Sequence, residues 1–165
     1  MTAAFAAAIF DRDLRTLSRE IEAYPTDADL WATRPSITNV GGTLALHLAG
    51  NLQHYVGARL GGTNYTRDRA AEFARRGVPR SELLREIEAA RAAVKTALSG
   101  SLPADLAADF PERIAGKTVN TGEYLMHLMT HFAYHLGQLD YHRRIVTGND
   151  AGVGAVQPSE LSTAR

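Results

Sequence analysis

The chain contains no cysteine among its 165 residues. This absence excludes a disulfide scaffold, a thiolate metal site and a catalytic cysteine. Any transition-metal site must therefore draw its ligands from histidine, aspartate and glutamate. A chain of this length is expected to form one domain, and it can bury about two-thirds of its unfolded surface without covalent cross-links.

The chain also lacks an excess of charge of either sign, because 18 basic residues balance 18 acidic ones. A broad electrostatic surface for nucleic acid or anionic membrane is therefore not expected. No apolar run approaches the length of a membrane span. The apolar start has no basic residues before it and is followed by Asp11, Arg12 and Asp13, so we expect a helix there and not a signal peptide. We expect a cytoplasmic protein that contacts neither nucleic acid nor membrane.

Strand-type alternation and internal repeats are also lacking, and apolar residues instead recur at helical spacing in four segments. These segments are 2–24, 41–60, 79–98 and 121–146. Asn120 can cap the last of them, with Glu123 three residues later, and Gly148 can end it. We predict an all-α four-helix bundle with long connections. One domain should span 1–148, followed by a loosely held tail over 149–165.

Histidines lie on the inward faces of two of these helices. At about 100° per residue, the fourth segment places His131 and His135 on one stripe with its apolar residues. His127 lies at the edge of that stripe. In the second segment, His47 shares a face with apolar residues, and Asn51 lies one turn further on. If the two helices are neighbours, the three inward histidines can converge.

Such a convergence would suit a divalent metal. Two histidines four residues apart on a helix form half of a zinc-type site, and a third leaves a coordination position open. Zinc or nickel is expected first, and iron, cobalt or copper is also compatible with imidazole. The stretch HFAYH lacks the glutamate of HExxH, so it lacks the general base of a metalloprotease. Outer hydrogen-bond partners for the rings could be Asn51, Gln138, Tyr124 or a backbone carbonyl.

The residues alone leave other interpretations open. His127 and His131 form a second pair at the same spacing. His54 and His142 could form a separate polar cluster or face water. All of these histidines could also be hydrogen-bonded core residues that bind no metal.

Three stretches of the chain stand out when they are taken together. They are HLAGNLQHY (47–55), RDRAAEF (67–73) and HLMTHFAYHLGQLDYHRR (127–144). Together they resemble the DinB-like superfamily of bacterial four-helix-bundle proteins, which is named for DNA-damage-inducible members, and the resemblance extends to about Gly148. It implies a metal-binding triad, with one histidine from the second helix and two from the fourth. On this chain these are His47, His131 and His135, because His135 matches the HxGQ placement of the superfamily.

The resemblance also implies an activity. Some members of the superfamily look like thiol-dependent transferases or isomerases that use mycothiol, bacillithiol or glutathione. A metal-bound thiol loses its proton and becomes a nucleophile at neutral pH. The alternatives are a non-catalytic metal-binding stress-response protein, a metal-dependent hydrolase, and a structural dimer without metal.

The charged connection after the second helix offers candidate anchors for an anionic thiol. Arg67 and Arg69 could reach such a cofactor. We prefer the alternative, in which Arg67, Asp68, Arg69 and Glu72 pair with one another and pin the connection. Tyr55 could line the mouth of the pocket or serve only in packing.

One face of the fourth helix is small and apolar and lies opposite the core stripe. It consists of Met126, Ala133, Gly137 and Tyr141. An exposed face of this kind often marks an interface, so we expect a homodimer, as is common for the resembled superfamily. The alternative is that the connection 101–117 covers this face. A small-molecule substrate is compatible with either arrangement.

Overall fold

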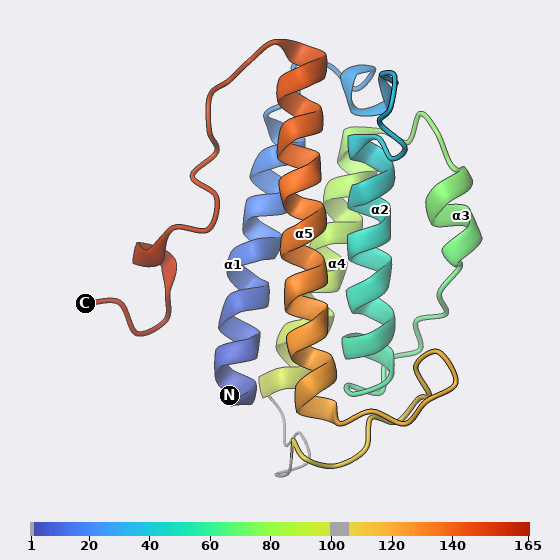
Figure 1. Ribbon diagram of the computed structural model, residues 1–165, viewed down its shortest axis with the longest axis vertical. Coiled ribbons are helices and arrows are strands. Elements are labelled where there is room, and N and C mark those ends of the chain that lie inside the picture. Colours follow the sequence, from blue (N-terminus) through green and yellow to red (C-terminus); the bar gives the residue numbers. More distant parts are fainter. Residues whose placement is uncertain (1, 100–105) are drawn as a thin grey trace.

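Four long helices lie side by side in the computed structural model, which describes residues 2–99 and 106–165 (Figure 1). They are α1 (Ala3–Glu22), α2 (Gly41–Leu52), α4 (Arg80–Ser99) and α5 (Thr121–Thr147). The described residues form no strand and only two isolated β-bridges, both between 109 and 120. The predicted all-α bundle is confirmed, and no described helix combines the length and apolar character of a membrane span.

Local capping fixes the ends of the helices. The Thr2 hydroxyl accepts a hydrogen bond from the Phe5 N–H and begins α1. Asn120 Oδ1 accepts from the Glu123 N–H at 3.0 Å, as expected for the start of α5. Gly148 ends α5 in the left-handed conformation, with φ of 70°.

The second helix departs from the prediction of a continuous helix over 41–60. The α-helical part ends at Leu52, and a π-helical turn, η2 (Gln53–Ala58), follows. Its hydrogen bonds reach one residue further, as from the Arg59 N–H to the His54 carbonyl at 3.0 Å. The wider turn rotates the residues after Leu52 relative to the face that carries His47.

A short helix that the sequence analysis did not predict lies in the charged connection. It is α3 (Arg69–Ala74), which Asp68 caps by accepting from the Ala71 N–H at 2.9 Å. Figure 1 shows α3 outside the four-helix bundle, beside α2. This position allows the connection to cover one side of α2.

The apolar faces of the four long helices form the core. Fully buried side chains come from each of them, for example Leu17, Leu48, Ile87 and Leu125. Trp31 packs against this core, and its indole N–H donates to the Val78 carbonyl at 3.1 Å.

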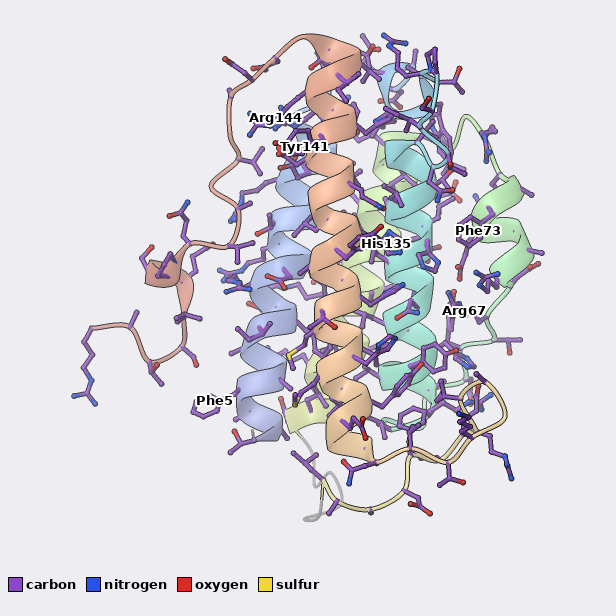
Figure 2. The ribbon with its side chains drawn as sticks, viewed as in Figure 1. Phe5, Arg67, Phe73, His135, Tyr141 and Arg144 are labelled. Carbon is purple, nitrogen blue, oxygen red and sulfur yellow. The ribbon has the colours of Figure 1, made fainter. Side chains whose placement is uncertain are left out.

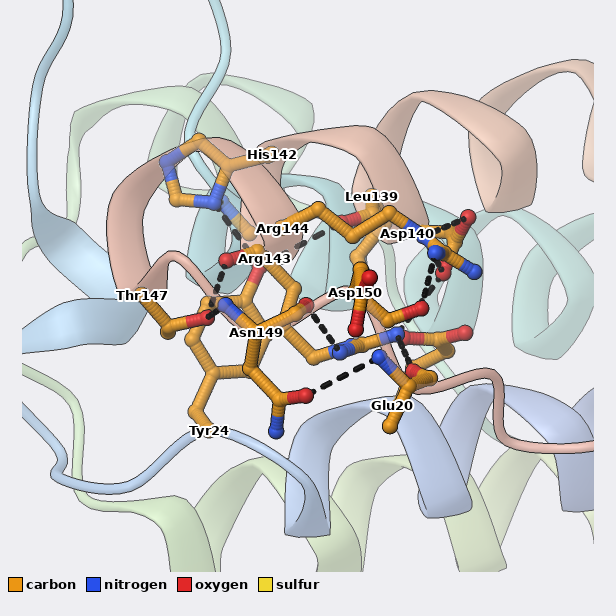
Figure 3. Close-up of polar contacts among 12 residues, drawn as sticks. Glu20, Tyr24, Leu139, Asp140, His142, Arg143, Arg144, Thr147, Asn149 and Asp150 are labelled. Carbon is orange, nitrogen blue, oxygen red and sulfur yellow. Dashed lines mark hydrogen bonds and ion pairs between the residues drawn. The ribbon is translucent and has the colours of Figure 1, made fainter.

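Arg143 is a fully buried charge on α5. Its guanidinium donates to Glu20 Oε2 at 2.6 Å and to Asp140 Oδ1 at 2.8 Å (Figure 3). It also donates to the carbonyls of Asn149 and Ala151. Further along, Arg19 pairs with Glu160. These two arginines of α5 and α1 therefore contact residues of the tail over 149–165.

Candidate metal centre

Three histidines from α2 and α5 converge on one point. His47, His131 and His135 each offer a ring nitrogen, and these nitrogens all lie within 4.8 Å of one another. The Nε2 atoms of His47 and His131 are 3.3 Å apart. His47 is buried, and the other two rings are partly buried. Figure 2 shows His135 on the side of α5 that faces α2.

A carboxylate from α3 orients His47. The His47 Nδ1–H donates to Glu72 Oε2 at 3.0 Å, because a carboxylate can only accept. The lone pair of the ring is then on Nε2, which faces His131. Arg67 in turn donates to both oxygens of Glu72, at 2.7 and 2.8 Å. Glu72 is the outer partner that the sequence analysis missed, although the stretch RDRAAEF contains it and the preferred interpretation already paired it with arginine.

Two local features bring Glu72 to this place. Asp68 begins α3, so that Glu72 lies one turn later on the face toward α2. Gly50 of α2 then leaves space for the carboxylate, because a Cβ added at Gly50 would overlap Glu72 Oε1. Burial alone would raise the pKa of Glu72, but the hydrogen bonds from His47 and Arg67 outweigh it and lower the pKa.

The Nδ1 atoms of His135 and His131 differ in whether they have a hydrogen-bond partner. His135 Nδ1 donates to Gln138 Oε1 at 2.7 Å, an arrangement that leaves Nε2 for the site. Gln138 was one of the expected outer partners. His131 Nδ1 is buried and finds no partner among the described residues. Asn51 and Tyr124 make no described hydrogen bond to the triad.

The surroundings favour neutral rings. Burial and the neighbouring His135 and His47 lower the pKa of His131 to about 4. Burial also lowers the pKa of His135, although the hydrogen bond to Gln138 opposes this shift. Neutral imidazoles keep the lone pairs that a metal requires.

The triad fits a divalent metal. A tetrahedral ion with bonds of about 2.0–2.1 Å to nitrogen places two such ligands about 3.3–3.4 Å apart. The Nε2 atoms of His47 and His131 are separated by 3.3 Å. Three histidines would leave the fourth coordination position for water or for a substrate atom.

The triad borders an open cavity of about 450 Å³. The other side chains that line it come from α2, α3, α5 and their connections. They are Asn39, Asn51, Tyr55, Arg67, Arg69, Phe73, Ile114, Tyr124, His127 and Leu128. A cavity of this size is in the range of small-molecule sites.

The two candidate anchors in this cavity differ in their charge balance. Glu72 neutralises Arg67, as the preferred sequence interpretation expected. Arg69 lies over the ring of Phe73, 4.9 Å from its centroid, and forms no ion pair with the described residues. The expected pairing of Arg69 within this connection is therefore not found, and Asp68 caps α3 instead. Arg69 is therefore a cation in this cavity that no carboxylate of the described residues neutralises. The ring of Tyr55 lies beneath the guanidinium of Arg67, with its centroid 5.6 Å from Arg67 Cζ.

The remaining histidines lie outside the triad. His127 is exposed and stacks on Tyr124 at 5.7 Å. His54 bonds to Glu112 at 3.1 Å and helps to hold the connection before α5. His142 accepts from the Tyr24 hydroxyl at 2.8 Å and donates to the Ala32 carbonyl at 2.9 Å. The suggested cluster of His54 with His142 is therefore wrong, because each is bound elsewhere.

The comparison with family models gives one match that spans most of the chain. The model described as mycothiol-S-transferase matches residues 6–148. The chain belongs to the mycothiol-S-transferase family. This family lies in the DinB/YfiT-like metal-binding superfamily, so the resemblance found in the sequence is confirmed. No curated protein and no solved structure matches the chain.

Membership of the mycothiol-S-transferase family indicates metal-dependent thiol transfer to small-molecule substrates. The three converging histidines could form the metal site that such a transferase requires. Which metal and which thiol bind, and what each residue does, depend on the side chains that line the cavity.

Proposed function

We propose that the chain is a thiol S-transferase that holds a divalent metal with His47, His131 and His135. The observation that carries this proposal is the convergence of three imidazoles at one wall of an open cavity of about 450 Å³. When bound, the metal would lower the pKa of a coordinated thiol and favour the thiolate. The absence of cysteine fits a thiol supplied by the cofactor.

The side chains around the triad would orient the metal ligands and the thiol. Glu72 would hold the Nδ1–H of His47, and Gln138 would do the same for His135. Arg69 would attract a carboxylate of the thiol, where the thiol carries one. Tyr55 and Tyr124 would pack against its uncharged part. We place this reaction in the cytoplasm, because low-molecular-weight thiols are kept reduced there.

Metal content tests the ligand assignment. We expect zinc or nickel at close to one ion per chain in untagged protein, measured by mass spectrometry after loading with each metal. His135→Ala should lose the ion. His127→Ala is the matched control, because His127 lines the same cavity from the same helix but lies outside the triad. Wild-type protein that retains no metal under any loading would contradict the proposal.

Thiol binding separates the transferase from its alternatives. We expect cobalt-loaded protein to develop a thiolate-to-cobalt charge-transfer band with mycothiol, bacillithiol or glutathione. A non-catalytic metal-binding stress-response protein or a metal-dependent hydrolase would bind cobalt without this band. Comparison of the three thiols identifies the cofactor. Arg69→Gln should weaken the binding only of a thiol that carries carboxylates.

We also propose a homodimer through the outer face of α5. Met126 and Tyr141 are 52% and 67% exposed, and Ala133 and Gly137 between them are exposed as well. Exposed apolar side chains at helical spacing favour association with a second helix. Size-exclusion chromatography with light scattering should give the mass of two chains, and Gly137→Arg should give one. A wild-type monomer at all concentrations would contradict this assembly.

A further inference from the structure

A second open cavity lies next to the one that the triad borders. It measures about 490 Å³ and is lined by the connection before α2 and by the neighbouring part of α5. Its lining residues are Ser36, Ile37, Thr38, Asn39, Tyr134, His135 and Gln138. Asn39 and His135 line the first cavity too, so the two cavities meet at these residues.

The walls of the two cavities differ in chemistry. The first contains the uncompensated cation Arg69. The second contains hydroxyl and amide groups, one aliphatic side chain, the ring of Tyr134 and the imidazole of His135. No lysine, arginine or carboxylate of the described residues lines it. Gln138 uses Oε1 to accept from His135 and makes no other hydrogen bond with the described residues, so its amide N–H groups are available. Such a wall suits an uncharged molecule that is partly apolar and carries acceptor atoms.

A tight turn holds the wall that faces α5. The Ile37 N–H donates to the Arg34 carbonyl at 3.2 Å, with Pro35 and Ser36 between them. Ser36 has φ of 64°, the conformation of the third residue in a type II turn, where glycine is usual. The turn is thus closed by its own backbone. It is followed by Thr38, which lines the second cavity, and by Asn39, which lines both.

We propose that this second cavity binds the acceptor substrate of thiol transfer, an uncharged electrophile, while the thiol occupies the first cavity. The proposal rests on the proposed function. The two molecules would then approach the triad from different sides and meet at His135. Holding two reactants in separate sites that meet at one point favours their reaction.

The test uses 1,3-dinitrobenzene, an uncharged aromatic probe without a leaving group, titrated into ¹⁵N-labelled, zinc-loaded full chain. We expect saturable shifts of the amide signals of residues 36–39 and 134 and of the Gln138 side chain. Anionic 3,5-dinitrobenzoate should bind more weakly. Thr38→Trp fills the cavity from an exposed position and should weaken binding of the probe by about tenfold or more, equivalent to about 1.4 kcal/mol.

The controls separate this cavity from the thiol site. Ile145→Trp also adds a large side chain to an exposed position near the end of α5, but outside both cavities, and should leave probe binding unchanged. Thr38→Trp should leave zinc content and thiol binding unchanged. Shifts centred on residues 67–73, or no saturable shifts, would overturn the proposal. The proposal would also be overturned if a thiol shifted the amide signals of residues 36–39 and competed with the probe. Because the probe needs no thiol, a failure of the proposed thiol chemistry would appear separately, in the cobalt spectra.

Discussion

Among single residues, Glu72 orients the one histidine of the triad that comes from α2. It is 6% exposed and accepts from His47 while Arg67 donates to both of its oxygens. A negative carboxylate in this position fixes the tautomer of His47 and makes its Nε2 a better donor to a metal. The charge of Glu72 is maintained because Arg67 and His47 lower its pKa in spite of burial.

Replacing Glu72 by glutamine should therefore weaken metal binding while the fold is kept. Loss of an outer carboxylate typically reduces metal affinity by about 10–100-fold, and we expect Glu72→Gln to fall in this range. Competition with a chromophoric chelator measures the affinity, and circular dichroism checks the fold. Glu123→Gln, at an exposed position in the first turn of α5, is the control. Equal affinities for the two variants would contradict the role given to Glu72.

His142 contributes to stability and lies away from the triad. Its Nδ1 accepts from the Tyr24 hydroxyl and lies 3.3 Å from the Gly41 N–H at the start of α2. Protonation of Nδ1 would remove this acceptor. Burial lowers the pKa of His142 below its ordinary value of 6.5, although the hydrogen bond to Ala32 opposes this. The folded state therefore binds this proton less tightly than the unfolded state does.

The sign of the pH dependence follows from that difference. The contribution of neutral His142 is complete above the unfolded pKa of 6.5 and is lost as the pH falls from there toward the lower folded pKa. With metal removed by a chelator, we expect the free energy of unfolding of wild type to fall between about pH 7.5 and about pH 5.5. His142→Gln should make this fall smaller in urea titrations. His127→Gln, which replaces an exposed ring, should leave the fall in the free energy of unfolding unchanged. An equal fall in both variants would argue against a role for His142.

At the scale of elements, α2 and α3 must approach closely for the site to form. Gly50 permits this approach, because a Cβ at this position would overlap Glu72 Oε1 and lie 3.0 Å from Glu72 Cδ. The Glu72 side chain cannot simply rotate away, since His47 and Arg67 both hold it. Glycine inside a helix costs about 0.5–1 kcal/mol relative to alanine, so its presence here serves the contact with α3.

Gly50→Ala should thus weaken metal binding although alanine is the better helix former. Gly137→Ala is the matched control, because a Cβ at Gly137 has nothing within 4 Å. We expect Gly137→Ala to stabilise the protein by about 0.5–1 kcal/mol and to leave metal affinity unchanged. Thermal unfolding and chelator competition on both variants measure the two quantities. Unchanged metal affinity in Gly50→Ala would mean that Glu72 can move without consequence.

The elements also show which features of this protein can be predicted from its sequence. Periodicity and caps gave the four long helices, and the ends of α5 at Asn120 and Gly148 were predicted from local chemistry. The face on which His47, His131 and His135 lie followed from helical spacing, and their convergence is found in the structure. These features depend on interactions within one turn or on simple periodicity.

The features that were missed depend on contacts between distant segments. The six residues of α3 are too few to give a periodic signal, and they lie against α2 because Glu72 reaches His47, 25 positions away in the chain. The π-helical turn η2 interrupts α2 where Gly57 packs closely against Ala93 of α4, and no local pattern marks it. Asn51 was expected as an outer partner, but it lines the cavity instead, because Glu72 already occupies the outer nitrogen of His47.

At the scale of the whole molecule, two polar systems lie at opposite sides of α5. The triad lies between α5 and α2, and the ion pairs of Arg143 lie between α5 and α1, together with the tail. Arg143 is completely buried. Burial raises the pKa of Glu20, although the hydrogen bond from Arg143 opposes this, so the carboxylate depends on its arginine to remain charged. Figure 3 shows how Arg143 reaches both Glu20 and the chain after α5.

Removing Arg143 should therefore destabilise the bundle and release the tail without affecting the metal. Breaking a buried ion pair from one side costs about 3–5 kcal/mol, so Arg143→Leu should lose stability in this range in urea titrations. The double variant Arg143→Leu with Glu20→Leu should recover much of the loss, because no unpaired carboxylate then remains in the core. Arg144→Leu, which removes a neighbouring arginine that also pairs with Asp140, should have a much smaller effect.

Limited proteolysis provides the second measurement, since Arg143 donates to the carbonyls of Asn149 and Ala151. We expect cleavage within 149–165 to become faster in Arg143→Leu than in Arg144→Leu, while chelator competition gives the wild-type metal affinity in both. Metal affinity that fell in parallel with stability would mean that the two sides of α5 form one coupled unit. Unchanged affinity would mean that the bundle supports the metal site and the tail independently, so that substitutions on the α1 side can alter stability without altering the chemistry on the α2 side.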